Sequence, residues 1–170
     1  MDWKKEAKEW IVALVGAVII GVILTQFVIV SAVVPTGSME NTIQPGDRII
    51  GWRLGYLFDY PKREDIVIFK YPDDESQLYV KRIIGLPGEV IEIKDGMVYV
   101  NGVAFSEDYI KEEPLFDGGP WLVPEDSYFV MGDNRNHSHD SRFWQNTYVK
   151  KEKILGKVMF RYWPSPEWMG

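Results

Sequence analysis

Residues 89–100 read EVIEIKDGMVYV, and this stretch decides the fold class of the chain. Two runs rich in β-branched residues, 89–94 and 97–100, flank the dipeptide Asp95-Gly96. That dipeptide favours the two positive-φ positions of a type I′ turn, so the segment predicts an antiparallel β-hairpin. Asn101-Gly102 predicts a second tight turn directly after it.

Similar short runs, bounded by turn residues, predict further strands at 47–52, 65–71, 77–84, 127–131 and 157–163. Residues 151–155 suggest one helical turn, and the Pro- and Gly-rich stretch 106–125 predicts irregular surface chain. The expected fold is therefore mainly β: an antiparallel β domain carried on a single N-terminal transmembrane α-helix.

The helix is expected at residues 11–34, which contain no charged side chain. About 24 residues at 1.5 Å each reach roughly 36 Å, more than the ~30 Å hydrocarbon core. A cleaved signal peptide is the alternative, but its apolar region covers about 7–15 residues and ends in a small-residue cleavage site. Ala32-Val33-Val34-Pro35 fits such a site poorly, so an uncleaved anchor is favoured.

The chain then divides into an N-terminal flank (1–10), the anchor (11–34) and a β domain (35–170). Lys4, Lys5 and Lys8 precede the anchor, whereas the first basic residue after it is Arg48. This asymmetry predicts a single-pass cell-membrane protein with a cytoplasmic N-terminus and an extracytoplasmic domain.

Composition excludes several function classes. The chain of 170 residues has a net charge of −6, which argues against nucleic acid as a partner because phosphates require clustered basic residues. It has no cysteine, so neither a disulfide framework nor a thiolate zinc site can form.

Ser38 lies shortly after the anchor, in the run PTGSM (35–39). A serine in such a run is commonly a turn residue. Gly37, however, permits a close bend that exposes both the hydroxyl and the N–H of Ser38. The Thr36 hydroxyl can point to the same space, so these two donors suit the oxyanion of a tetrahedral intermediate.

Lys81 lies in the strand-like segment 79–84, and a lysine can act as the base for a serine without histidine. Most strand lysines face solvent, but Tyr79 and Ile83, on the same face, favour burial. The chemistry requires a neutral amine, which from a reference pKa near 10.4 demands desolvation.

A polar cluster follows at residues 132–142. Its simplest interpretation is a surface loop with ordinary charge pairs. His137, His139 and Asp140 also allow a metal site or a Ser38–His–Asp triad, although two histidines in alternate positions are weak evidence for either.

Four blocks follow one another behind the anchor: PTGSMENTI (35–43), PGDRI (45–49), YVKRIIGLPGE (79–89) and MGDNRNHSHDSR (131–142). In this order they strongly resemble bacterial type I signal peptidases, over nearly the whole chain. The resemblance implies a membrane-anchored serine endopeptidase with the β fold of that family. It would remove signal peptides from secreted preproteins by cutting after small residues at positions −1 and −3.

By this resemblance Ser38 is the nucleophile and Lys81 the general base, and Ser138 orients the lysine amine. Thr36 assists the Ser38 N–H at the oxyanion. Supporting positions near the site are implied for Asp133, Asp140, Arg142 and Met39. No cofactor and no metal are required.

The expected partners are preprotein signal peptides and the lipid bilayer. Two alternatives remain beside this interpretation. One is a Ser–Lys protease dedicated to a single substrate, and the other is a membrane-anchored binding or scaffold protein without catalytic activity.

Overall fold

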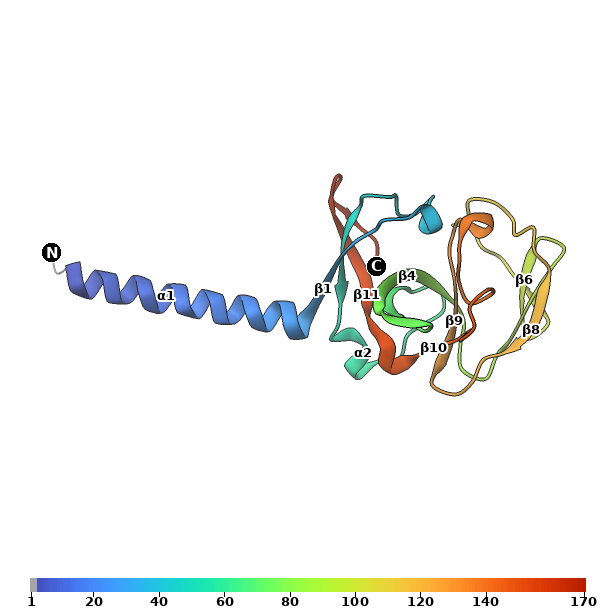
Figure 1. The fold of residues 1–170 in the computed structure, drawn as a ribbon, viewed down its shortest axis with the longest axis horizontal. Coiled ribbons are helices and arrows are strands. Elements are labelled where there is room, and N and C mark those ends of the chain that lie inside the picture. Colours follow the sequence, from blue (N-terminus) through green and yellow to red (C-terminus); the bar gives the residue numbers. More distant parts are fainter. Residues whose placement is uncertain (1–2) are drawn as a thin grey trace.

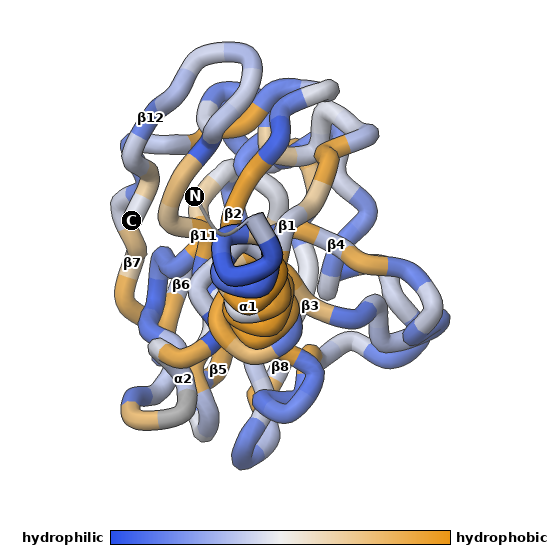
Figure 2. The backbone as a smooth tube through the Cα atoms, turned by 90° about the vertical axis from the view of Figure 1, so that its left-hand side faces the viewer, coloured by the Kyte–Doolittle hydropathy of each residue, from blue (hydrophilic) through white to orange (hydrophobic). Residues whose placement is uncertain are grey.

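The structure, a computed structural model, describes residues 3–170, and for Leu57 the backbone alone. Residues 1–2 of the predicted N-terminal flank lie outside the described residues. A long helix, α1 (Trp3–Ile23), extends from a β domain and ends in a π-helical turn, η1 (Leu24–Val28) (Figure 1). Within residues 3–170 this is the one helical segment long and apolar enough to cross a membrane. Viewed end-on, it is hydrophobic except near its N-terminus (Figure 2).

The larger sheet carries most of the domain. Its strands are β1 (Ile29–Val33), β2 (Arg48–Trp52), β3 (Ile66–Tyr71), β4 (Asp74–Gly85), β9 (Ser127–Met131), β10 (Val149–Lys150), β11 (Ile154–Trp163) and β12 (Glu167–Trp168). They are arranged in the order β1-β2-β11-β3-β4-β9-β10, with β12 paired to β11. Because every neighbouring pair is antiparallel, β1 and β4 run in the same direction.

A smaller sheet lies at the end of the domain away from α1 (Figure 1). It contains β5 (Val90–Lys94), β6 (Met97–Val100), β7 (Val103–Phe105) and β8 (Gly118–Leu122), in the order β7-β6-β5-β8. The hairpin predicted at 89–100 forms β5 and β6, and its turn has positive φ at Asp95 (51°) and Gly96 (78°). The remaining elements are a short helix, α2 (Gly55–Phe58), and three 3₁₀ turns: η2 (Gly37–Met39), η3 (Arg135–His137) and η4 (Lys151–Lys153).

The predicted mainly-β class is confirmed. The interpretation of 106–125 as wholly irregular is wrong, because β8 lies within that range. β8 pairs with β5 along one side only. Pro120 has no N–H to donate and is tolerated in an edge strand of this kind.

The apolar stretch 11–34 is divided differently from the prediction. Helical structure begins at Trp3 and ends at Val28, and residues 29–33 form strand β1 on the edge of the larger sheet. Arg53 fixes this junction: its N–H donates to the Val28 carbonyl (2.9 Å) and its Nε to the Ile29 carbonyl (3.0 Å). Outside a membrane, pairing with β2 satisfies the backbone of β1. The last part of the apolar run therefore belongs to the folded domain.

Apolar side chains join the two sheets. The buried cluster between them contains Ile84, Ile91, Ile93, Val98, Val123, Phe129 and Met131. Members of this cluster come from β4 and β9 of the larger sheet and from β5 and β6 of the smaller one. Burial of these side chains holds the smaller sheet in place.

We therefore expect Ile91→Ala to lower the free energy of unfolding by about 2–5 kcal/mol, because it removes buried methyl groups and leaves a cavity. Val103→Ala, on an exposed position of β7, should change it by less than about 0.5 kcal/mol. Urea unfolding of the full chain in detergent, followed by tryptophan fluorescence, measures both. Equal losses in the two variants would contradict this account of the core.

Candidate active site

Ser38 lies in η2, the turn that follows β1. Its side chain is buried, with 7% of the residue exposed. Asn134 holds the turn from the other side of the site, since its N–H donates to the Ser38 carbonyl (3.1 Å) and its Nδ2 to the Gly37 carbonyl (3.0 Å). Asn134 thus holds the backbone of the turn that carries Ser38.

Lys81 reaches Ser38 from β4. Its backbone pairs with Val67 of β3, and only 3% of the residue is exposed. The Lys81 Nζ lies 2.5 Å from the Ser38 Oγ, within hydrogen-bond distance. The two residues, 43 positions apart in the chain, therefore form a direct contact in a buried setting.

Burial lowers the pKa of the Lys81 amine from the ordinary 10.5 to about 8. Removal from water disfavours the charged form, and this effect is the largest. The negative charges of Asp140 and Asp133 act in the opposite direction, whereas the positive charge of Arg142 lowers the pKa further. The balance leaves a substantial fraction of neutral amine at mildly alkaline pH.

Asp133 and Asp140 are each held by an arginine. Arg82 donates to both oxygens of Asp133, from Nε (2.9 Å) and from a terminal nitrogen (2.6 Å). Arg142 does the same to Asp140, at 2.8 and 2.9 Å. Both carboxylates are fully buried, and a buried charge is tolerated only when it is paired in this way.

Ser138 lies next to Gly132, as the Ser38 carbonyl does, and its hydrogen bond goes to Asp140 rather than to the Lys81 amine. Its hydroxyl donates to Asp140 (2.6 Å), and the Gly132 N–H donates to the same carboxylate oxygen (3.0 Å). A Cβ at Gly132 would overlap both the Ser138 side chain and the Ser38 carbonyl oxygen. Glycine at 132 therefore allows the loop to approach Ser38 closely.

Thr36 and Met39 differ in their surroundings. The Thr36 Oγ1 lies 3.5 Å from the Ser38 Oγ, at the limit of a hydrogen bond. Met39 is fully buried and packs in the core cluster with Val34 and Ile43. Met39 thus packs η2 against the hydrophobic core.

The sequence does not predict a role for several residues near the site. Arg82 was not assigned a role, although it follows Lys81 directly. Arg135 is buried and forms two hydrogen bonds to Glu107, both of 2.6 Å. Glu107 lies in a loop that carries no recognisable pattern, so nothing in the sequence indicates this partner. The available signals were positional: Arg82 follows Lys81 in the run YVKRIIG, and Arg135 belongs to the polar run GDNR.

A groove of about 590 Å³ leads to the pair. One wall is formed by residues 31–36, from β1 and the segment after it, and the other by residues 77–81 of β4. β1 is an edge strand, and β9 pairs with β4 only from Arg82 onward, so both walls present unpaired strand edges. An extended peptide fits such a groove by adding hydrogen bonds to these edges.

His137 and His139 line the same groove and are exposed at its rim. The His139 Nε2 lies 3.4 Å from the Tyr71 hydroxyl. Among the described residues, the basic group within hydrogen-bond distance of the Ser38 hydroxyl is the Lys81 amine. Within residues 3–170, no group of three or more histidine and acidic side chains is arranged to hold a metal ion.

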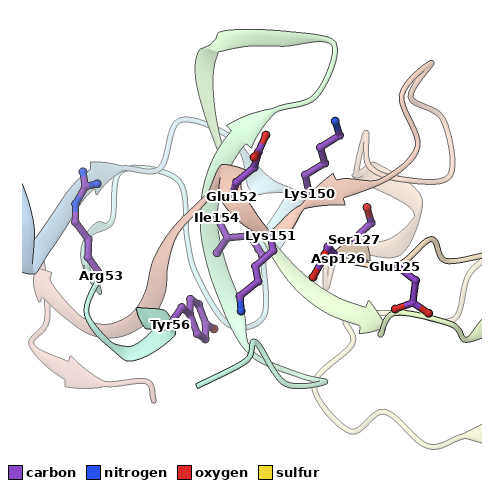
Figure 3. A pocket seen from close by; sticks show the side chains of 9 residues that line it. All are labelled: Arg53, Tyr56, Glu125, Asp126, Ser127, Lys150, Lys151, Glu152 and Ile154. Carbon is purple, nitrogen blue, oxygen red and sulfur yellow. The ribbon is translucent and has the colours of Figure 1, made fainter. Parts of the chain in front are cut away.

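A second cavity, of about 640 Å³, lies elsewhere and contains neither Ser38 nor Lys81. Figure 3 shows its lining between Arg53 and Tyr56 on one side and Glu125 and Lys150 on the other. Basic and acidic side chains are mixed along it, which gives no net charge to attract a charged ligand. This cavity is slightly larger than the groove, but its lining does not pair a serine with a buried lysine as the groove does.

Comparison with known proteins bears on the class of the molecule. The family described as "Signal peptidase, peptidase S26" matches residues 7–163. The probable signal peptidase I-2 of Synechocystis is 41% identical over 158 residues, which cover 90% of this chain and 72% of that protein. The signal peptidase I of Bacillus amyloliquefaciens is 38% identical and covers 96% of this chain and 92% of its own length.

A crystal structure of a signal peptidase I from Enterococcus faecalis shares the fold, with a TM-score of 0.53 and 37% identity. The match covers 59% of this chain and 98% of that one. The chain therefore belongs to the signal peptidase family, peptidase S26, and is a serine peptidase. Within that family its relatives are signal peptidases I, which confirms the resemblance found in the sequence.

The lowered pKa of Lys81 has a consequence for stability. Between pH 8 and 10.5 the unfolded chain holds a proton on this lysine that the folded chain has lost, so stability rises with pH across that window. Relative to Lys81→Met, we expect the free energy of unfolding of the wild type to increase by about 3 kcal/mol from pH 8 to 10.5.

Urea titrations of the full chain at several pH values measure this difference. Lys94→Met, at an exposed position of β5, is the control and should track the wild type. Parallel pH curves for the wild type and Lys81→Met would contradict a desolvated amine.

Proposed function

We propose that the protein removes signal peptides from secreted preproteins, cleaving after small residues at positions −1 and −3, with Ser38 as nucleophile and Lys81 as general base. The observation that carries this proposal is the 2.5 Å contact between the Lys81 Nζ and the Ser38 Oγ in a buried setting. The family membership and the groove with two unpaired strand edges support it further.

In this mechanism neutral Lys81 accepts the proton of the Ser38 hydroxyl as its oxygen attacks the scissile carbonyl. The Ser38 N–H and the Thr36 hydroxyl donate to the oxyanion that forms. Protonated Lys81 then gives its proton to the leaving amine as the C–N bond breaks. Water, deprotonated by the same amine, hydrolyses the acyl-enzyme and frees Ser38.

The remaining residues position these groups. The family resemblance gives Ser138 the role of orienting the amine, and Asp140 holds the Ser138 hydroxyl through a 2.6 Å hydrogen bond. Asp133 and Arg142 maintain the charge balance around the amine. Their contribution is indirect, because they act through Lys81 and Ser138.

The arrangement also suits a membrane-bound substrate. We infer that α1 anchors the enzyme, with its N-terminus in the cytoplasm and the β domain outside, as Lys4, Lys5 and Lys8 suggest. A signal peptide has its apolar segment in the bilayer, and β1 extends from the helix directly to Ser38. The nucleophile is thus held near the point where the scissile bond leaves the lipid, which raises its effective concentration there.

Processing of a preprotein with a small-x-small site tests the proposal. Lys81→Ala and Ser38→Ala should each abolish cleavage, because the couple requires both groups. The matched control, His137→Ala with His139→Ala, should retain cleavage, since neither imidazole takes part in the proton transfer. Gel analysis of precursor and product measures this, and the opposite pattern would favour a histidine base. Assays on several unrelated preproteins distinguish a general peptidase from one dedicated to a single substrate.

The pH profile offers a second test. Since only the neutral amine accepts a proton, kcat/KM should rise through a midpoint near pH 8, the pKa of Lys81. Initial rates between pH 6 and 10, with a fluorogenic peptide, measure the profile. A rate independent of pH across this range would exclude Lys81 as the base.

A further inference from the structure

Beyond the dyad, an apolar surface continues from the groove on the side away from α1. This distal patch consists of Leu115, Phe116, His139 and Phe143. Leu115 is 88% exposed, Phe143 46% and Phe116 38%. Exposed apolar side chains gathered in this way commonly mark a binding surface.

The patch is continuous with the groove. His139 lines the groove together with Ser38 and Lys81. Its ring stacks on Phe143 at 6.4 Å between centroids, and Phe143 meets Phe116 edge-on at 5.2 Å. These rings form a row that begins at the groove and ends beside the smaller sheet.

The position of the row relative to the membrane follows from its neighbours. Phe116 precedes β8, and a Cβ at Gly118 would overlap its ring, so Phe116 packs against the start of that strand. β8 lies at the end of the domain farthest from α1 (Figure 1). The Leu115 N–H donates to the Asn136 side chain (2.9 Å), which ties the patch to η3. The patch therefore lies farther from α1 than the Ser38–Lys81 pair does (Figure 1).

We propose that the distal patch binds the first residues of the mature segment of the preprotein, those after the scissile bond, and favours apolar or aromatic side chains there. The inference rests on the proposed function. A chain that enters from the bilayer along β1 has its signal-peptide residues between residues 31–36 and 77–81. In this proposal the residues after the scissile bond pass η3 and reach the patch, which Asn136 connects to η3.

The spacing of the rings suits this occupant. In an extended peptide every second side chain points to the same face, about 6.7 Å apart. The row of three rings, with centroids 6.4 and 5.2 Å apart, is long enough to contact more than one such side chain. Glu112, Glu113 and Asp117 flank the patch and are exposed, so acidic residues in the same segment should be disfavoured.

Two preproteins test the inference. They share the signal peptide and cleavage site, and differ only within about six residues after the scissile bond. One carries apolar or aromatic residues at alternate positions, and the other carries serine there. For the wild type in detergent, kcat/KM should favour the apolar substrate by about tenfold, mainly through KM, because partial burial of aromatic rings contributes about that much.

Phe116→Ser combined with Phe143→Ser should reduce this ratio to about one, whereas Phe116→Leu with Phe143→Leu should retain most of it. Val103→Ser, at another exposed apolar position, should leave the ratio unchanged. Urea unfolding confirms that each variant is folded. A wild-type ratio near one, or a ratio preserved in the double serine variant, would overturn the proposal.

Failure of the two proposals can be told apart. If the wild type cleaved neither substrate, the proposed function would fail. Anisotropy of a labelled apolar mature-segment peptide, with the wild type and the double serine variant, would then decide the patch alone. Equal binding to both would overturn it. A change in particle mass or in binding to lipid vesicles in the double serine variant would assign the patch to a second copy or to lipid, and would also overturn it.

Discussion

The candidate active site depends on the burial of one amine, that of Lys81. Burial alone favours the neutral form of Lys81, but two carboxylates nearby favour the protonated one. Arg82 and Arg142 neutralise those carboxylates through paired hydrogen bonds. The two carboxylates can thus accept hydrogen bonds in the site while they raise the pKa of Lys81 only to a limited extent. Burial lowers the pKa of Lys81, and the paired arginines limit the opposite effect of the two carboxylates.

The sheet topology makes this contact possible. Four antiparallel pairings separate β1 from β4, so the two strands point the same way and approach the dyad from the same end. Ser38 follows one strand, Lys81 belongs to the other, and the loop after β9 closes the site through Asn134 and Gly132. The groove and the dyad are therefore two results of one curved sheet.

Local patterns in the sequence predict those elements whose structure is determined by neighbouring residues. The hairpin at 89–100 and most strands follow from turn residues and β-branched runs. Ser38 and Lys81 were found from their types, neighbours and family resemblance, and the structure brings them together. β1 was not predicted, because a fully apolar run has no periodicity that separates strand from helix, and its state depends on pairing with β2. The Glu107–Arg135 ion pair joins residues far apart in the chain, so the sequence did not predict it either.

β1 connects the N-terminal helical segment to the groove. It follows η1 without a flexible linker, Arg53 clamps the junction, and the same strand forms one wall of the groove. Helices adjust to bilayers of different thickness by changing their tilt. Any such adjustment of α1 is transmitted through the covalent chain to the surface on which the substrate lies. In the proposed membrane-anchored enzyme, a change in the tilt of α1 would therefore reach one wall of the groove.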